Sequence, residues 1–344
     1  MKIGIVGFAS TGKTTVFQWL TGNEPDPAAS QRGQLGTAEL PDERLAWFTE
    51  HFSPKKSTPA KIEFIDMPGL HPSERRDNPR RLALIREAGG LLVVLSGFSG
   101  GNLADELRRF REECLFADLE IVTNRIAKLE PQLKKAKPAK EKEADAAELA
   151  VMQRIQKGLE DGTAGSIKLT PEEEKSIRSF QLLCFKPELV LVNIGDDLIG
   201  KPLPADLLAL SPKAMAAPTK LELELAELSA EDREAFMKDL GLTGSAHAAI
   251  LRGIFYGMGM EVFYTVGEDE CRAWGVPKGS DAVVCAGQIH TDLARGFVRA
   301  SVIGYDDYRK AGSLKEAKAK GILRLEGKTY IVKDGEVMEV LHSS

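Results

Sequence analysis

The chain has 344 residues, of which 46 are Lys or Arg and 51 are Asp or Glu, so its net charge is −5. Hydrophobic residues make up 43% of the chain and charged residues 28%. This composition excludes a disordered or collagen-like chain, and the length predicts about two globular domains. No apolar run approaches the roughly 18 residues of a membrane helix, and the N-terminus lacks the apolar segment of a secretory signal. We therefore expect a cytoplasmic protein that binds no membrane.

Four short apolar runs predict buried strands at residues 2–7, 62–65, 91–95 and 189–192. A helix-like or loop segment follows each of them. Buried strands that alternate with helices are typical of an α/β fold, in which a mostly parallel sheet is covered on both faces. The four cysteines are scattered without metal-ligand spacing, and we expect free thiols at Cys114, Cys184, Cys271 and Cys285.

The stretch from about residue 120 to 180 is rich in charge and contains a single aromatic residue, Phe180. A Lys- and Glu-rich segment around Pro138 divides it into two parts. This pattern predicts an antiparallel helical hairpin, with its tip at Pro138, that projects from the α/β domain. Apolar residues recur at helical spacing in two series, namely Ile126, Leu129 and Leu133, and then Leu149, Met152, Ile155 and Leu159.

The last part of the chain alternates strand-like runs, at residues 283–286, 297–302, 329–332 and 337–341, with turns. We predict a small, separate, strand-rich domain with a hairpin that turns at residues 334–335. A basic cluster in this part has Glu316 as its lone acid. It could contact RNA phosphate, or it could form an exposed helix surface without a partner. The cluster comprises Arg309, Lys310, Lys315, Lys318, Lys320 and Arg324.

Residues 7–14 (GFASTGKT) match the phosphate-binding motif G-x-x-x-x-G-K-[ST] between a predicted strand and a helix-like segment. In this setting the loop N–H groups and the helix N-terminus bind a β-phosphate. We predict that Lys13 spans the β- and γ-phosphates, that Thr14 ligates Mg²⁺ and that Thr15 reaches the α-phosphate. The loop residues Ser10, Thr11 and Gly12 complete this predicted site for a nucleoside triphosphate.

Residues 66–69 (DMPG) follow the predicted strand at 62–65. A carboxylate at that strand end can hold Mg²⁺ through water, and the Gly69 N–H can sense the γ-phosphate. We therefore expect Asp66 and Gly69 to act with Lys13 and Thr14 in phosphoryl transfer. A nucleotide switch needs this second motif, whereas a metabolic kinase does not.

The position after this motif, which usually orients the attacking water, is the apolar Leu70. His71, Arg80 and Arg81 are nearby substitutes, although a charged helix surface explains them equally well. Because Leu70 cannot orient a water, we predict slow intrinsic hydrolysis.

Residues 193–196 (NIGD) follow the strand predicted at 189–192 and are similar to the N-K-x-D motif that reads the base in GTPases. The Asp196 carboxylate can accept two hydrogen bonds from guanine, whereas adenine would present another acceptor to it. Ile194 replaces the usual lysine of the motif. Thr219 and Lys220 lie where a further loop would offer an N–H to the base. Alternatively, Asn193 and Asp196, like Thr219 and Lys220, belong to simple turns.

The order of these motifs resembles that of the YchF (Obg-like ATPase) family of translation-factor-class P-loop proteins. Sequences in the tail, CRAW at 271–274, QIHTD at 288–292, GFVRA at 296–300 and LEGKTYIVKDG at 325–335, resemble the family's C-terminal TGS-type domain. The resemblance covers nearly the whole chain. It implies a P-loop G domain formed by residues 1–119 and 181–256, a coiled-coil hairpin insertion at 120–180, and a β-grasp-like TGS domain at 257–344.

The resemblance also implies hydrolysis of ATP and GTP, usually with ATP preferred, and association with ribosomes or another RNA–protein complex. We expect Mg²⁺ as cofactor and a monomeric chain. Ser30 falls near the family's switch I threonine and is a further candidate Mg²⁺ ligand. The family's loop with a histidine implicated in hydrolysis has no counterpart after Leu95. Two functions therefore stay open: a slow NTPase switch, and a nucleotide-dependent binding module with negligible hydrolysis. The choice of base is also open, because Asp196 favours GTP and the resemblance favours ATP.

Overall fold

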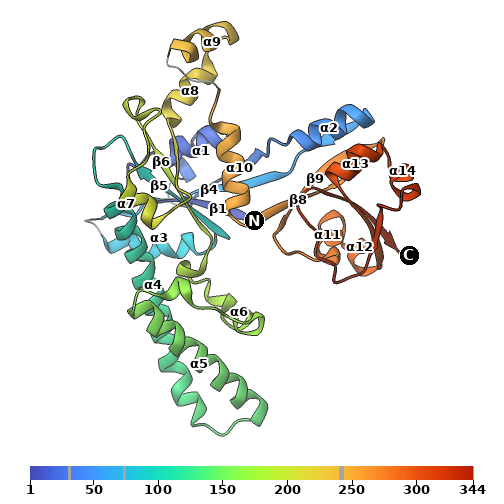
Figure 1. Cartoon of the computed structure of the whole chain (residues 1–344). Coiled ribbons are helices and arrows are strands. Elements are labelled where there is room, and N and C mark those ends of the chain that lie inside the picture. Colours follow the sequence, from blue (N-terminus) through green and yellow to red (C-terminus); the bar gives the residue numbers. More distant parts are fainter. Residues whose placement is uncertain (30–31, 73–74, 240–243, 344) are drawn as a thin grey trace. The chain divides into compact units, whose positions relative to one another are not determined.

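The computed structural model describes residues 1–29, 32–72, 75–239 and 244–343. The chain divides into two compact units, whose elements are labelled in Figure 1. The first unit consists of Met1–Gly36 and Glu63–Thr243, and the second of Thr37–Ile62 and Gly244–Ser344. Residues 37–62, which we expected in the G domain, are thus grouped with the C-terminal part. In the described ranges, every helix is too short or too polar to cross a membrane.

A six-stranded sheet with the strand order β2-β4-β1-β5-β6-β7 forms the centre of the first unit. The pairs that β1 forms with β4 and β5, and that β6 forms with β5 and β7, are parallel. The four strands predicted for this part of the chain are confirmed to within one residue at each end. The strands are β1 (Lys2–Val6), β2 (Gln34–Glu39), β4 (Lys61–Asp66), β5 (Gly90–Ser96), β6 (Glu188–Asn193) and β7 (Met215–Ala217).

Helices cover both faces of this sheet, as predicted for an α/β fold. Helices α3 (Asn78–Ile85), α4 (Leu103–Leu133) and α7 (Ala205–Leu210) share one apolar cluster with β1, β5 and β6. Helix α1 (Lys13–Thr21) contacts β1 and α8 (Thr219–Glu227) on the other face. The remaining elements are α5 (Ala139–Glu160), α6 (Pro171–Ile177), α9 (Ala230–Asp239) and the 3₁₀ turns Pro27–Ala29, Arg75–Asp77, Ala164–Ser166, Arg178–Phe180, Leu183–Phe185 and Asp196–Leu198.

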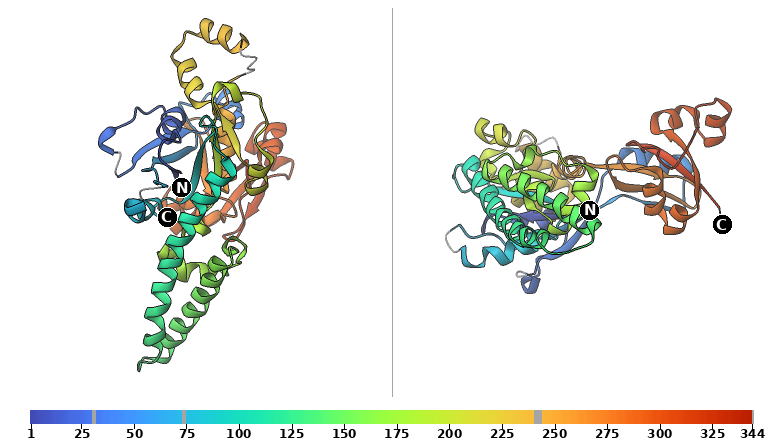
Figure 2. Two further views of the ribbon diagram at one scale, coloured as in Figure 1. Left: turned by 90° about the vertical axis from the view of Figure 1, so that its left-hand side faces the viewer. Right: turned by 90° about the horizontal axis from the view of Figure 1, so that it is seen from below.

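The predicted helical hairpin is formed by α4 and α5, which lie antiparallel and side by side (Figure 2). Pro138 immediately precedes α5, as the turn prediction required. Helix α4 begins well before residue 120, because the Asn102 side chain caps it by accepting a hydrogen bond of 2.9 Å from the Asp105 N–H. One helix therefore packs on the sheet with its first turns and forms the hairpin with its last. The buried residues of the two predicted series are Ile126, Leu129, Met152, Ile155 and Leu159.

The second unit contains a six-stranded mixed sheet with the order β11-β10-β12-β8-β9-β3. The neighbours β8 and β12 are parallel, whereas β8 with β9 and β10 with β12 are antiparallel. A parallel central pair between antiparallel neighbours is the β-grasp-like arrangement that the resemblance implied. The strands are β3 (Lys56–Thr58), β8 (Met260–Thr265), β9 (Glu270–Pro277), β10 (Phe297–Gly304), β11 (Arg324–Glu326) and β12 (Glu336–His342). The helices are α2 (Glu43–Phe52), α10 (His247–Gly257), α11 (Ala282–Ile289), α12 (Thr291–Arg295), α13 (Tyr305–Ala311) and α14 (Leu314–Ala319).

Two strands predicted for this unit are wrong. Residues 283–286 lie in α11, where the Asp281 side chain caps the helix by accepting from the Val284 N–H at 2.8 Å. Residues 329–332 form only an isolated bridge, between Ile331 and Asp281, so the hairpin predicted around residues 334–335 does not form. Instead, β12 pairs with β10 and β8. A short apolar run has the same pattern in a strand and in a buried helix, and here tertiary contacts decided between them.

Residues 37–62 pack on the sheet of the second unit through helix α2 and strand β3. Strand β3 lies parallel to the edge strand β9. The Phe48 ring of α2 packs against Tyr264 of β8 and Tyr308 of α13, with ring centroids 5.2 and 5.5 Å apart. Without this segment, large aromatic side chains of the C-terminal part would be exposed, so the segment completes the core of that part.

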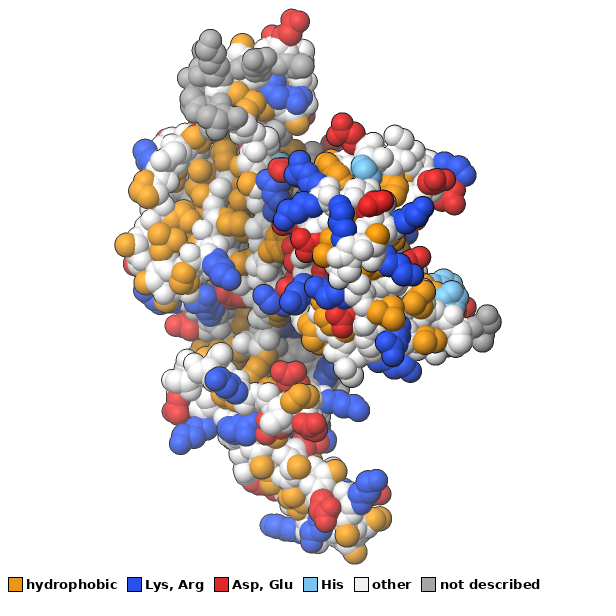
Figure 3. All heavy atoms as spheres, turned by 45° about the vertical axis from the view of Figure 1, so that its right-hand side comes forward, with side chains coloured by type: hydrophobic (Ala, Val, Ile, Leu, Met, Phe, Trp, Pro, Cys, Tyr) orange, Lys and Arg blue, Asp and Glu red, His pale blue; other side chains and the backbone are white. Residues whose placement is uncertain are grey.

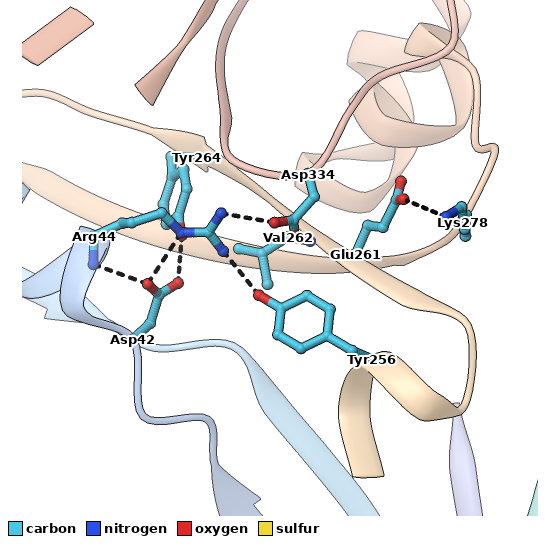
Figure 4. A network of polar contacts seen from close by, with 8 residues as sticks. All are labelled: Asp42, Arg44, Tyr256, Glu261, Val262, Tyr264, Lys278 and Asp334. Carbon is cyan, nitrogen blue, oxygen red and sulfur yellow. Dashed lines mark hydrogen bonds and ion pairs between the residues drawn. The ribbon is translucent and has the colours of Figure 1, made fainter. Parts of the chain in front are cut away.

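Arg44 of α2 holds the segment in place through a polar network (Figure 4). Its guanidinium donates to the Asp334 carboxylate at 2.7 Å and to the Tyr256 hydroxyl at 2.8 Å. Tyr264 donates to the carboxylate of Asp42, the N-cap residue of α2. Asp334 in turn accepts a hydrogen bond from the Val262 N–H at 2.9 Å. Because each of these charges has partners, the network can be partly buried at little cost.

Candidate functional site

The predicted phosphate-binding loop connects β1 to α1 in the first unit. Ser10 and Gly12 have φ values of 65° and 84°, so the loop takes left-handed turns that direct successive N–H groups inward. A Cβ at Gly12 would lie 2.1 Å from the Asn193 side-chain nitrogen, and only glycine fits there. The strand–loop–helix context that the sequence predicted is therefore present.

Lys13 lies in the first turn of α1 with its side chain almost completely buried, and its Nζ donates to the Phe8 carbonyl oxygen. Burial lowers the pKa of Lys13 to about 8, against the opposing effect of the Asp66 and Glu106 charges. A buried ammonium group that faces too little negative charge is a strong site for a phosphate group. Lys13 is therefore suited to bind a phosphate group, as its place in the motif predicts.

Thr14 and Asp66 come together at the end of β4, as predicted. The Thr14 hydroxyl donates to Asp66 Oδ2 at 2.7 Å, while Asp66 Oδ1 is buried and has no hydrogen-bond partner. Burial raises the pKa of Asp66, although the Thr14 hydrogen bond and the charge of Lys13 oppose this shift. A hydroxyl beside a carboxylate with a free oxygen fits Mg²⁺, which prefers oxygen ligands and retains several waters. Mg²⁺ at this place would neutralise charge on the phosphates.

Gly69 brings the second motif against the phosphate-binding loop. A Cβ at this residue would lie 2.7 Å from Lys13 Nζ and 2.8 Å from the Ala9 nitrogen. The next residue, Leu70, forms a parallel bridge with Phe8 and is fully buried. Leu70 thus anchors the segment and presents no polar group to a water molecule, as its residue type predicted.

Three side-chain atoms in the described part of the chain are buried without a hydrogen-bond partner: Asp66 Oδ1, Arg81 Nη1 and Ser96 Oγ. Two of them, those of Asp66 and Ser96, belong to residues beside the phosphate-binding loop. Asp66 contacts Thr14, and Arg81 acts electrostatically on Lys13. Ser96 lines a cavity of about 390 Å³ together with Ala9, Ser10 and Glu106, among other residues. Because unpartnered buried polar atoms are rare in folded proteins, the two beside this loop agree with its choice as the candidate site.

The end of β6 contacts the same loop. Asn193 is buried, and its amide donates to the Thr11 carbonyl oxygen at 3.3 Å and accepts from the Thr219 hydroxyl at 2.6 Å. Asn193 and Thr219 therefore support the phosphate-binding loop from the carboxyl end of β6. Asp196 is exposed in the following 3₁₀ turn. The structure thus joins Asn193 and Thr219 directly, while Asp196 stays open to solvent.

One residue at this end of the site was not predicted. Phe98, in the loop after β5, is 51% exposed, and its ring carbon lies 3.8 Å from the position of a Cβ on Gly12. Its Cβ lies 3.6 Å from the equivalent position on Gly195. The Phe98 ring therefore lies beside both the phosphate-binding loop and the segment that the sequence predicts to read the base. The glycines on both sides of Phe98 in the sequence (residues 97–101, GFSGG) were the available signal, because they mark a loop that holds an aromatic residue at the surface.

The remaining predicted site residues differ in how exposed they are. Ser10 is exposed at the mouth of the loop, Thr11 is buried and donates to the Phe8 carbonyl oxygen at 3.2 Å, and Thr15 is half-buried on α1. Ser30, the further candidate for Mg²⁺, lies outside the described residues. No cluster of three or more His, Cys, Asp or Glu side chains suited to a metal occurs in the described ranges. The fold and this arrangement of loop, lysine and carboxylate define a P-loop protein of the G-domain class.

Comparison with known proteins agrees with this class. The family model YchF-GTPase_C, described as "Protein of unknown function (DUF933)", matches residues 260–342. A model described as "50S ribosome-binding GTPase" matches residues 2–125. The "Ribosome-binding ATPase YchF" of Bacillus subtilis is 32% identical over 364 residues, covering 98% of each chain, and that of Haemophilus influenzae is 33% identical over 359 residues, with the same coverage. The chain belongs to the YchF family.

A solved structure has the same fold. The Schizosaccharomyces pombe YchF GTPase aligns with 99% of this chain and 97% of its own length, with a TM-score of 0.81 and 23% sequence identity. The α/β unit, the hairpin and the strand-rich C-terminal part that the resemblance implied are therefore confirmed as one known architecture.

Proposed function

We propose that this protein is a Mg²⁺-dependent nucleoside triphosphatase of low intrinsic rate that acts as a switch on ribosomes. The observation that carries the proposal is the buried Lys13 beside the Thr14–Asp66 pair, with Gly69 against the same loop. Thr14 and Asp66 would hold Mg²⁺, and Lys13 with the loop N–H groups would hold the β- and γ-phosphates. The nucleotide acts chiefly as a conformational signal.

The base site is proposed to accept both ATP and GTP. Asn193 and Thr219 shape the loop behind the base, while the exposed Asp196 and the Phe98 ring are available to it. An aromatic ring stacks on any purine, whereas the Asp196 carboxylate pairs only with guanine's donors. Curated relatives are named ATPases and the similar solved structure is named a GTPase, which fits dual use.

Ribosome association is proposed from the relatives' names and from the basic cluster of the second unit. In the described residues, the side chains of Lys315, Lys318 and Lys320 have no acidic partner within 4 Å, and all three are exposed. Figure 3 shows Lys and Arg side chains spread over the surface of this unit, at the right of the view. Exposed, unpaired lysines suit contact with RNA phosphates, which positions a protein without reading sequence. We place this function in the cytoplasm and expect a monomer.

A second candidate is a binding module that holds its nucleotide without hydrolysing it. The buried, apolar Leu70 favours this candidate, because no polar group follows the second motif directly. The complete set of phosphate-binding residues favours the switch.

Single-turnover hydrolysis separates the two candidates. Purified protein is mixed with radiolabelled ATP or GTP, with Mg²⁺ or with EDTA, and with or without ribosomes. A switch hydrolyses slowly alone, faster with ribosomes, and not with EDTA. Tight binding with no hydrolysis under any condition would support the binding module. Fast unaided hydrolysis, or no binding of either nucleotide, would contradict both candidates.

A further inference from the structure

The side chain of Asn78 binds the main chain of the residue that follows Leu70. Asn78 is the first residue of α3 and is buried. Its Oδ1 accepts from the His71 N–H and its Nδ2 donates to the His71 carbonyl oxygen, each at 3.0 Å. One amide group thus gives His71 the two hydrogen bonds that a paired residue of a neighbouring antiparallel strand would give. Because an N–H only donates and a carbonyl oxygen only accepts, the side chain at this place must carry both an acceptor and a donor.

This pairing lies one residue away from the phosphate-binding loop. The Leu70 N–H donates to the Gly7 carbonyl oxygen at 3.0 Å, and the Ala9 N–H donates to the Leu70 carbonyl oxygen at 2.8 Å. The main chain after the second motif is therefore held by the loop on one residue and by Asn78 on the next. Gly69, whose N–H is predicted to sense the γ-phosphate, directly precedes these two residues, so its position depends on both sets of hydrogen bonds.

The same side chain also contacts α4. Asn78 Nδ2 donates to Glu113 Oε2 at 3.2 Å. Glu113 precedes Cys114, in the part of α4 that packs on the sheet before the helix continues into the hairpin. Asn78 therefore joins the segment after the second motif to two helices through three hydrogen bonds. These bonds hold their partners firmly, because little water reaches a buried amide to replace a lost bond.

We propose that Asn78 is a positioning residue of the nucleotide site, which holds the Gly69 N–H in place for the γ-phosphoryl group and joins this part of the site to α4 through Glu113. The inference rests on the proposed function and adds to it the residue by which the site distinguishes a triphosphate from a diphosphate. Asn78 acts through the main chain of residues 69–71 and takes no chemical part in hydrolysis.

The physical basis is pre-organisation of a hydrogen-bond donor. A main-chain N–H stabilises charge on a phosphate most when it already points to the place of that charge, because ordering a free segment costs conformational entropy. A diphosphate has no γ-phosphoryl group and gains nothing from Gly69. Loss of the Asn78–His71 pairing should therefore weaken triphosphate binding and leave diphosphate binding almost unchanged. A purely structural pairing would lower stability without this difference.

The first test measures the affinity of Asn78→Ala and Asn78→Asp for non-hydrolysable analogues of ATP and GTP and for the diphosphates, by calorimetry with Mg²⁺. Affinity for the triphosphate analogues should fall about tenfold in both variants, as expected for the loss of about one hydrogen bond. Affinity for the diphosphates should change less than about twofold. The matched control is Leu82→Ala, which removes a buried side chain from the same helix. It should lower the thermal unfolding midpoint and leave the ratio of the two affinities unchanged.

A second pair of variants tests the link to α4. Glu113→Gln alone should change the affinity ratio less than about twofold, because the side-chain oxygen of glutamine still accepts from Asn78. Combined with Asn78→Asp, the same substitution should restore part of the lost triphosphate affinity. The glutamine amide can donate to the new aspartate, whereas Glu113 repels it. An equal ratio in Asn78→Asp and in the double variant would overturn the link to α4.

Hydrogen exchange of the wild-type protein gives a readout that does not depend on the folding of any variant. Because binding and ordering are reciprocal, the His71 amide should exchange about tenfold more slowly with a triphosphate analogue than with the diphosphate. Equal exchange in the two complexes, or an unchanged affinity ratio in Asn78→Ala, would overturn the proposal. Failure of the wild-type protein to bind any nucleotide would instead overturn the proposed function.

Discussion

Two partly buried arginines, one in each unit of the chain, are placed in opposite surroundings. In the second unit, Arg44 is paired with Asp334, Tyr256 and Asp42, so its charge is used inside the fold. In the first unit, Arg81 has a buried nitrogen without a partner. Both residues are partly buried arginines on helices, and the difference lies only in what surrounds them.

This difference separates structural from ligand-directed polar groups. Polar groups that are paired within the fold stabilise one arrangement of the chain, whereas unpaired ones are a cost that a bound ligand removes. The three unpartnered atoms among the described residues all belong to the first unit, and those of Asp66 and Ser96 lie beside its phosphate-binding loop. The comparison predicts that substituting a polar group that is paired within the fold changes stability. Substituting an unpaired one should instead change ligand binding.

The largest expected effect is on nucleotide binding. Lys13→Ala should weaken the affinity for ATP and GTP by at least about 100-fold, because it removes charge-assisted hydrogen bonds to the phosphates. Isothermal titration calorimetry measures the loss. The exposed Lys128 of α4, in the same unit but outside the site, provides the control, and Lys128→Ala should bind both nucleotides normally. Undiminished binding by Lys13→Ala would contradict the whole functional assignment.

The second effect is on stability. Arg44→Ala should lower the free energy of unfolding of the second unit by about 2–3 kcal/mol, because Asp334 and Tyr256 lose a partner in a partly buried place. Urea denaturation followed by tryptophan fluorescence measures it. Lys55→Ala, which removes an exposed ion pair with Asp269, should change it by less than about 0.5 kcal/mol. Equal effects of the two substitutions, or a large loss of nucleotide affinity in Arg44→Ala, would break the comparison.

The third effect is on pH dependence. The pKa of Lys13 is about 8 in the free protein and near its ordinary value of 10.5 in the unfolded chain. The unfolded chain therefore holds more protons between these values, and the free energy of unfolding of the ligand-free protein should rise with pH in that window. Bound phosphates require the charged lysine, so binding should take up a proton above pH 8, and affinity should fall by up to about tenfold per pH unit. Calorimetry in buffers of different ionisation enthalpy measures the number of protons taken up on binding. The absence of proton uptake at pH 9 would refute the lowered pKa of Lys13.

The smallest effect is on base preference. Asp196→Glu should shift the ratio of GTP to ATP affinity about fivefold toward ATP, or about 1 kcal/mol, because the longer side chain displaces the carboxylate from guanine's donors. Competition between the two triphosphate analogues gives the ratio. Asp197→Glu, at the adjacent exposed position, serves as the control. An unchanged ratio would remove Asp196 from base reading.

Much of the first unit could be predicted because its signals are local. A buried strand, a glycine-rich loop and a helix follow one another between residues 2 and 21, and the chemistry of each segment depends on its own residues. The same holds for Asp66 and Asn193 at the ends of β4 and β6, because the carboxyl ends of parallel strands meet at one edge. The second unit was harder to predict, because the apolar run at residues 283–286 suits either a helix or a strand.

By itself, the sequence determined which residues could hold a phosphate and a cation, since that capacity depends on residue type and spacing along a few consecutive positions. The tertiary structure decided which polar groups remain unpaired. Arg80 and Arg81 have the same side chain, and only the packing of α3 buries one nitrogen of Arg81 while Arg80 stays exposed. It also decided that residues 37–62 complete the core of the second unit, because the aromatic partners of Phe48 come from residues more than 200 positions away in the chain. Burial and long-range pairing are properties of the folded chain, and no local pattern contains them.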